Sequence, residues 1–182
     1  MKATHLFLMV LVAGPCWGLI ELGIEPVGGY ERVQRLAPTA HTKDRLVYGA
    51  RITAGVLSLR GELEYLRATD TESFTDQDLS TTDTADKAKL GLRSQISFFR
   101  LLALYARLGA QATKNRHVET TGGQTTTTDQ AITYNPYLGV GLRIGLGSKL
   151  NLNGDITAVI KDTSNLSNNE FQAMAGLSVR LP

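Results

Sequence analysis

The clearest pattern in the chain is an alternation of apolar and polar positions between residues 134 and 160, YNPYLGVGLRIGLGSKLNLNGDITAVI. One side carries leucine, valine, isoleucine and alanine, and the other carries mainly glycine and polar residues. The alternation breaks at Gly147-Ser148-Lys149 and then resumes. A period of two over two segments joined by a short turn predicts a β-hairpin. Each arm is long enough for the roughly 9–11 residues that a tilted strand needs to cross a bilayer, which indicates a transmembrane β-barrel.

The same alternation recurs along the rest of the chain. It predicts eight strands, at residues 19–30, 45–54, 57–65, 88–98, 102–113, 134–146, 150–160 and 171–181. Pro26 and Gly28-Gly29 lie in the second half of the first strand, where we expect a kink or bulge.

The connections between these segments alternate in length. Those after the second, fourth and sixth strands are two or three residues long, and the others are long and polar. Short turns alternating with long loops along an even number of strands are typical of bacterial outer-membrane barrels. The predicted fold is therefore all-β: an eight-stranded antiparallel up-and-down transmembrane β-barrel with both termini on the periplasmic side.

The first 18 residues, MKATHLFLMVLVAGPCWG, have the features of a secretory signal peptide: an early lysine, a short apolar run and small residues. The run is too short to span a membrane as a helix. We expect cleavage after Gly18, with residues 1–18 as signal peptide and 19–182 as the barrel domain. A buried first helix and a lipid anchor on Cys16 are the alternatives, and Pro15 disfavours the anchor.

The charge balance and the cysteine content narrow the class of protein further. Removing Lys2 from the 19 lysines and arginines leaves 18 against 17 aspartates and glutamates, and this balance gives no indication of a nucleic-acid partner. Cys16 is the single cysteine, so the mature chain would have no disulfide and is not a stapled secreted module.

Alternation alone does not say which face is inside, and a soluble up-and-down barrel would show the same pattern. The polar face is poor in lysine, rich in small residues and arginine, and nearly balanced in charge, which suits the inside of a narrow barrel. The predicted interior polar network consists of Glu21, Glu25, Arg51, Arg60, Glu62, Glu64, Arg93, Arg107, Arg143, Asp155 and Arg180.

Aromatic residues on the apolar face gather near the strand ends, where a girdle at the membrane interface would lie. The predicted lipid-facing girdle consists of Tyr30, Tyr48, Tyr65, Phe98, Tyr134 and Phe171.

Two segments resemble those of known barrels. Residues 135–142, NPYLGVGL, are similar to the Pro-Tyr-x-Gly-x-Gly strand of small bacterial outer-membrane β-barrels, the OmpA-like and OmpX-like family. Residues 176–181, GLSVRL, partly match the terminal signal that the barrel-assembly machinery recognises, although the chain ends in Leu181-Pro182 rather than an aromatic residue, and Met174 replaces a usual polar residue. The resemblance implies an exported protein of a Gram-negative outer membrane. Its partners would be outer-membrane lipid, lipopolysaccharide and the assembly machinery.

Candidate chemistry is sparse. His117 with Glu119 could form part of the catalytic residues of a hydrolase, and the acidic residues between 70 and 86 could hold a cation. The composition of both stretches, and of the threonine-rich stretch 119–129, is more typical of solvated loops. We therefore expect no enzyme activity, catalytic residue, metal or cofactor. The expected function is a structural or surface-interaction role through the external loops. The alternatives are a narrow porin-like channel and a lipid-modifying enzyme at the barrel rim.

Overall fold

Strands dominate the computed structural model, which describes residues 20–35, 41–56, 58–74, 79–99, 101–165 and 168–181. The expected signal peptide at residues 1–18 lies outside these ranges. No helix within them is long and apolar enough to cross a membrane. The strands are β1 (Glu21–Arg35), β2 (His41–Val56), β3 (Leu59–Phe74), β4 (Leu79–Phe99), β5 (Leu102–Thr121), β6 (Gln124–Asp129), β7 (Thr133–Gly145), β8 (Leu150–Val159) and β9 (Glu170–Leu181).

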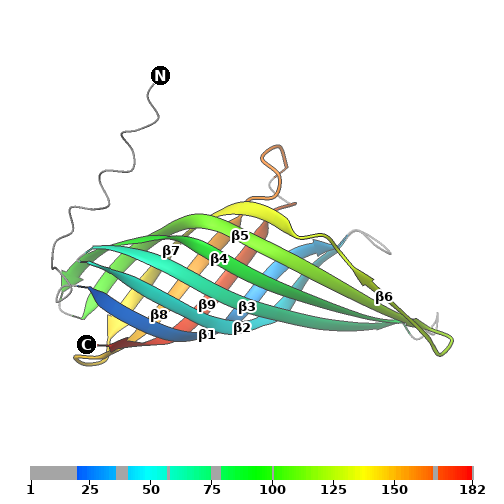
Figure 1. Cartoon of the computed structure of the whole chain (residues 1–182), viewed down its shortest axis with the longest axis horizontal. Coiled ribbons are helices and arrows are strands. Elements are labelled where there is room, and N and C mark those ends of the chain that lie inside the picture. Colours follow the sequence, from blue (N-terminus) through cyan, green and yellow to red (C-terminus); the bar gives the residue numbers. More distant parts are fainter. Residues whose placement is uncertain are drawn as a thin grey trace, which may run out of the picture.

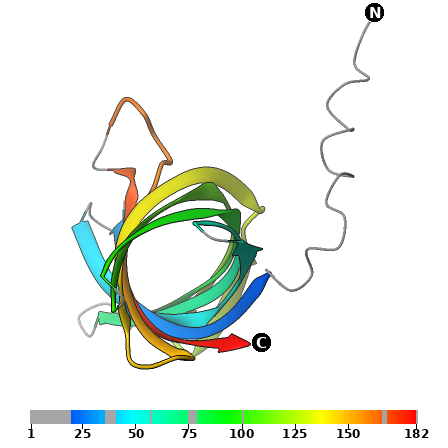
Figure 2. The same ribbon diagram turned by 90° about the vertical axis from the view of Figure 1, so that its left-hand side faces the viewer.

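Eight of these strands close into a ring. The sheet order β4-β3-β2-β1-β9-β8-β7-β5 is completed by pairing of β4 with β5, and every pair is antiparallel. Figure 2 shows the ring from the end where β1 starts and β9 finishes. That end also carries the short β2–β3, β4–β5 and β7–β8 connections, and we call it the turn end; the opposite end is the loop end. The predicted all-β, eight-stranded up-and-down barrel is confirmed.

The first strand differs from its prediction. It runs through Pro26 and continues to Arg35 instead of ending at Tyr30. Its register with β9 is the same before and after the proline, from Ile24↔Val179 to Val27↔Gly176, so the expected bulge was wrong. Glu25 and Pro26 lack partners in β9, which is how the strand accommodates a residue without an amide hydrogen.

Three stretches predicted as loops are largely strand, and the first of them, residues 31–44, lengthens β1 and β2. Residues 69–74 of β3, 79–86 of β4, 113–121 of β5 and all of β6 form an antiparallel extension beyond the barrel, which we call the projecting sheet (Figure 1). Their polar composition suggested loops, but threonine is a strong strand former because its branched Cβ suits a pleated surface.

Cross-strand contacts and a tight turn support the projecting sheet. The hydroxyl oxygens of Thr71 and Thr82 lie 3.2 Å apart. Gly122 and Gly123, between β5 and β6, have φ values of 57° and 79°, as the commonest two-residue hairpin turn requires. The Gly-Gly pair was therefore a hairpin signal within the threonine-rich stretch.

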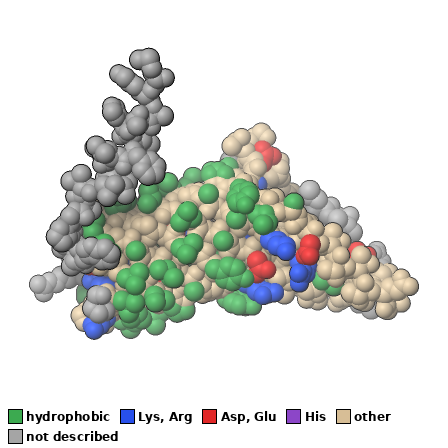
Figure 3. Space-filling view, in the orientation of Figure 1, with side chains coloured by type: hydrophobic (Ala, Val, Ile, Leu, Met, Phe, Trp, Pro, Cys, Tyr) green, Lys and Arg blue, Asp and Glu red, His purple; other side chains and the backbone are tan. Residues whose placement is uncertain are grey.

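The two faces of the barrel are inverted relative to a water-soluble protein. Leu90 and Leu108 on the outer face are 69% and 60% exposed, whereas Arg51 and Arg107 on the inner face are 0% and 1% exposed. On the face seen in Figure 3, hydrophobic side chains are spread over the barrel and thin out toward the projecting sheet. So large an exposed apolar surface requires an apolar surrounding.

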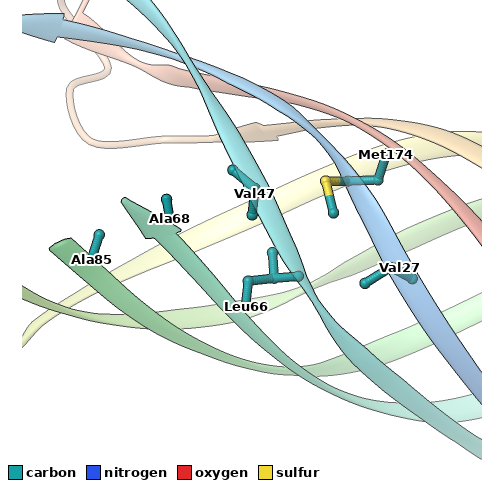
Figure 4. Close-up of a cluster of buried hydrophobic side chains, with 6 residues drawn as sticks. All are labelled: Val27, Val47, Leu66, Ala68, Ala85 and Met174. Atoms are coloured by element: carbon teal, nitrogen blue, oxygen red, sulfur yellow. The ribbon is translucent and has the colours of Figure 1, made fainter. Parts of the chain in front are cut away.

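One part of the lumen is apolar. Inward-facing residues from four neighbouring strands and β9 form a buried cluster toward the loop end (Figure 4). The cluster consists of Val27, Val47, Leu66, Ala68, Ala85 and Met174. Polar side chains therefore do not occupy the whole interior.

Two inward tyrosines pack over glycines of neighbouring strands. Tyr105 and Tyr137 are only 3% and 2% exposed. A Cβ added at Gly141 would lie 2.3 Å from Cζ of Tyr105 and 2.6 Å from the carbonyl oxygen of Gly154. The glycine therefore makes room for the ring.

Replacing Gly141 with alanine is expected to lower the free energy of unfolding by about 1–3 kcal/mol, because the tyrosine or the adjacent backbone must move. Urea titration of the refolded barrel, followed by circular dichroism, measures this change. Gly61→Ala is the control, since its Cβ would meet nothing nearer than 3.6 Å. Equal stabilities of the two variants would show that the ring moves aside freely.

Candidate functional site: the charged lumen

Charged side chains occupy the lumen in three layers along the barrel axis. The loop-side layer consists of Glu31, Arg45, Lys87 and Glu170. The middle layer consists of Glu25, Arg51, Glu62, Glu64, Lys89, Arg93, Arg107 and Asp155. The turn-side layer consists of Glu21, Arg60, Arg143 and Arg180.

The middle layer spans the lumen. Arg51 of β2 and Arg107 of β5 each place a guanidinium nitrogen 2.9 Å from a carboxylate oxygen of Asp155 on β8. Arg107 also lies 2.9 Å from Glu64 on β3, and Nζ of Lys89 on β4 lies 2.7 Å from the same carboxylate. These contacts join five strands through side chains that are almost fully buried.

The inward tyrosines complete the middle layer. The hydroxyl of Tyr137 donates to Glu62 at 3.2 Å, and that of Tyr105 donates to Asp155 at 3.1 Å. The guanidinium carbon of Arg93 lies 3.4 Å from the centre of the Tyr105 ring. The layer contains four cations and four carboxylates, so its formal charges cancel, which makes their burial tolerable.

The loop-side layer was missed by sequence reasoning. Lys87 is fully buried between Glu31 and Glu170, and Arg45 also contacts Glu31. Arg45 was expected at the start of the second strand but was not counted in the network. Glu31, Lys87 and Glu170 were assigned to loops, because the first strand was expected to end at Tyr30, the fourth to begin at residue 88 and the eighth at residue 171. Extending the alternation by a few residues would have placed them inside. Lys89 was on the predicted polar face but was left out of the network, because the interior was expected to favour arginine.

The structure places all eleven residues of the predicted network on the lumen side. Eight are less than 10% exposed, and Glu21, Arg143 and Arg180, near the turn end, are intermediate. The eleven fall into two groups, since Glu21, Arg60, Arg143 and Arg180 form the turn-side layer and the rest belong to the middle layer.

The six aromatic residues of the predicted girdle all point outward. Their exposed fractions range from 44% for Phe171 to 74% for Tyr134. Phe98 is near the turn end and the other five are toward the loop end. The hydroxyl of Tyr65 donates to Asp86 at 2.6 Å, so this ring lies where the apolar outer face meets polar residues.

His117, the candidate for hydrolytic chemistry, lies on the projecting sheet. Its Nδ1 is 2.8 Å from Asp83 and its Nε2 is 3.9 Å from Glu119. Within the described part of the chain, no hydroxyl group forms a hydrogen bond with His117, so no nucleophile is placed beside it. No group of three or more histidine, cysteine or carboxylate side chains in the described residues could hold a metal ion.

The connection between β8 and β9 is ordered by one carboxylate. The backbone amide and hydroxyl of Ser164 both donate to Asp162, at 2.8 and 2.6 Å, and the side-chain amide of Asn168 donates to its other oxygen at 3.0 Å. These bonds lower the pKa of Asp162 to about 2. The carboxylate of Asp162 is therefore charged at neutral pH and accepts these hydrogen bonds there.

A closed antiparallel barrel with an apolar outside and a charged interior defines a transmembrane β-barrel protein. The chain belongs to the outer membrane protein β-barrel domain family, whose model matches residues 41–178. This membership places it in the bacterial outer membrane. No curated protein sequence matches the chain significantly.

Solved structures show the same fold. Ail, the attachment invasion locus protein of Yersinia pestis, in complex with the heparin analogue sucrose octasulfate, superposes with a TM-score of 0.62 and 13% identity over 90% of this chain and 99% of that one. Neisserial surface protein A gives 0.55 and 15%, covering 88% and 97%. The N-terminal barrel of Pseudomonas aeruginosa OprF gives 0.54 and 13%, covering 88% and 97%. At such identities the likeness shows the fold alone.

Proposed function

We propose that this protein is an exported outer-membrane barrel with a structural or surface-interaction role, performed by the projecting sheet above a plugged lumen. The proposal rests on the unequal lengths of the strands. β4 and β5 contain 21 and 20 residues, whereas β8 contains 10. Since about 9–11 residues cross a bilayer, roughly half of β4 and β5 must stand outside it. All six residues of β6 are polar and exposed, as an aqueous surface requires.

The middle layer supports a plugged lumen. Eight-stranded barrels have an interior just wide enough for side chains to fill, and here four cations and four carboxylates meet across it. We therefore propose no steady diffusion of solutes, and no enzyme activity at the rim.

The outer surface supports lipid and lipopolysaccharide as partners. The six girdle residues would lie at the membrane interfaces. Exposed Arg32 and Arg116, at the loop end, are each paired with an aspartate at distances of 2.8 and 2.9 Å. Arg116 belongs to the projecting sheet, so only Arg32 would offer its remaining guanidinium donors to lipid phosphates, as charge-assisted hydrogen bonds. The barrel-assembly machinery would insert the chain after cleavage of residues 1–18.

Labelling of intact cells tests the orientation. Thr127→Cys lies in the projecting sheet and Ser148→Cys lies at the turn end. A membrane-impermeant maleimide is expected to label the first variant in whole cells and the second only after lysis. The wild-type chain, whose single cysteine is in the proposed signal peptide, gives the background. Labelling of Ser148→Cys alone in intact cells would contradict the proposal.

Planar-bilayer recording tests the plugged lumen. The refolded wild-type barrel is expected to give no stepwise conductance, because the buried charged layer closes the lumen. Discrete, reproducible steps would favour the narrow channel instead. A change in lipid A mass on expression would favour the rim enzyme.

A further inference from the structure

The turn-side layer carries more positive than negative charge. Among the described residues this layer holds three arginines, Arg60, Arg143 and Arg180, and one carboxylate, Glu21, which pairs with Arg60 and Arg180. The middle layer cannot compensate, because its four carboxylates already face four cations. Two positive charges are left over at this end of the lumen.

Several hydrogen-bond donors in the same place have no partner. Nε of Arg60, Nε of Arg93 and the side-chain amide nitrogen of Asn153 are buried without a hydrogen bond. The Arg60 and Arg93 side chains are only 10% and 5% exposed. Arg143 forms no hydrogen bond or ion pair with any other described residue. Buried donors without acceptors are costly, so a water or an anion is expected to serve them. Arg51 and Arg107 in the middle layer also have an unpaired donor, but carboxylates already lie beside them, whereas none lies beside Arg143 among the described residues.

A small cavity lies among these donors. It has a volume of about 20 Å³, room for one water molecule, and its lining includes Arg60, Arg93, Arg143, Arg180 and Asn153. Glu25 also lines it, with its carboxylate facing Arg51 and Arg93. A second cavity of about 150 Å³ shares Arg143 and Arg180 and opens toward the turn end. The larger cavity has room for an anion, and the partly exposed side chains of Arg143 and Arg180, which line both cavities, can adjust around it.

We propose that the turn-side layer is a binding site for a small divalent oxyanion, phosphate or sulfate, entering from the turn end. The excess of two positive charges matches such an ion. Guanidinium groups bind its tetrahedral oxygens through paired N–H donors, and the unpaired Nε atoms would then gain acceptors. The anion would be free in the periplasm or would belong to a phospholipid headgroup.

Calorimetry of the refolded full-length mature chain tests this proposal. Sodium sulfate and inorganic phosphate are titrated into the barrel in dodecyl maltoside, a detergent without phosphate, at constant ionic strength in chloride. Saturable binding of both, with none for chloride, is expected. The absence of saturable sulfate and phosphate binding in the millimolar range would overturn the site, and equal binding of chloride would overturn its selectivity for a divalent ion.

Arg143→Gln locates the site. Because Arg143 has no carboxylate partner among the described residues, its removal leaves no buried carboxylate unpaired, and heat-modifiable gel migration confirms folding. Binding is expected to weaken at least about tenfold, as loss of a charge-assisted hydrogen bond implies. The control is Arg67→Gln, on the outer face 3.8 Å from Asp86, which should bind sulfate like the wild type. Unchanged binding by Arg143→Gln would place the anion elsewhere.

Binding measured in a lipid bilayer distinguishes the two sources of the anion, a free ion and a phospholipid headgroup. In nanodiscs of phosphatidylglycerol, apparent sulfate affinity is expected to fall relative to the detergent if a headgroup phosphate occupies the site, and to stay the same if the guest is a free ion. Both outcomes support oxyanion binding and assign its source.

Discussion

Replacing Glu64 with glutamine is expected to lower the free energy of unfolding of the barrel by about 3–5 kcal/mol. The carboxylate lies 2.5 Å from Arg51, 2.7 Å from Lys89 and 2.9 Å from Arg107, and all four side chains are fully buried. Glutamine keeps the shape but removes the charge, which leaves three cations packed together in a region from which water is excluded. Equilibrium unfolding in urea from detergent micelles, followed by circular dichroism, measures the change.

Asp44→Asn is the matched control for Glu64→Gln. Asp44 also pairs with an arginine, Arg32, at 2.8 Å, but both side chains are more than half exposed. Water and salt screen such a pair, so the unfolding midpoint should not move. A midpoint for Glu64→Gln equal to that of this control would mean that water reaches the middle layer and that the lumen is not plugged there.

Replacing Leu108 with arginine is expected to destabilise the barrel in a phospholipid bilayer by about 2–4 kcal/mol. Leu108 is on the outer face of β5, 60% exposed, and pairs with Leu92 and Leu138 on the neighbouring strands. It lies midway along the apolar belt, where an arginine is farthest from water. Reversible unfolding of the protein from lipid vesicles measures this effect.

Thr127→Arg, in the exposed strand β6, is the control for the lipid-facing position. It adds the same side chain outside the bilayer and should leave the stability unchanged. If the two arginine variants were equally stable, the leucine-rich outer face would not be in lipid. The proposed position of the aromatic girdle at the membrane interfaces would then be wrong.

Much of this architecture could be predicted because a strand has only two faces. Because side chains alternate between the two faces, the face of one residue determines the face of every other residue in the strand. Leu108 therefore points outward and Arg107 points inward. The alternating connection lengths then determine the strand order. Neither inference requires knowledge of contacts between distant residues.

Strand ends were predicted poorly, because the alternation of apolar and polar residues fades where a strand leaves the apolar part of the barrel. Beyond residue 113, β5 continues through lysine, asparagine and arginine, whose polarity is as suited to a loop as to a solvated strand. Pairing with β4 decides the outcome, since the two strands match residue for residue up to Leu79↔Thr121. The same error concealed Glu31 and Lys87, whose positions inside the lumen depend on strands longer than expected.

The division of the charged residues into layers also lay beyond sequence reasoning. The near balance of charge along the chain hides a local imbalance, because Arg51 and Arg107 are neutralised in the middle layer while Arg143 is not. Which cation meets which carboxylate depends on the stagger between strands, and that is fixed only when the ring closes.

The continuous pairing of β4 with β5 has a mechanical consequence. The only register shift between them is beside the turn end, between Ser97 and Phe99, so the ladder carries on from the lipid-embedded part to the tip without a hinge. At about 3.4 Å per residue, the stretch 113–121 extends roughly 27 Å along the strand. The extension is therefore a stiff spacer: its tip is held at a set distance from the barrel, and any force applied there is transmitted directly to the barrel wall.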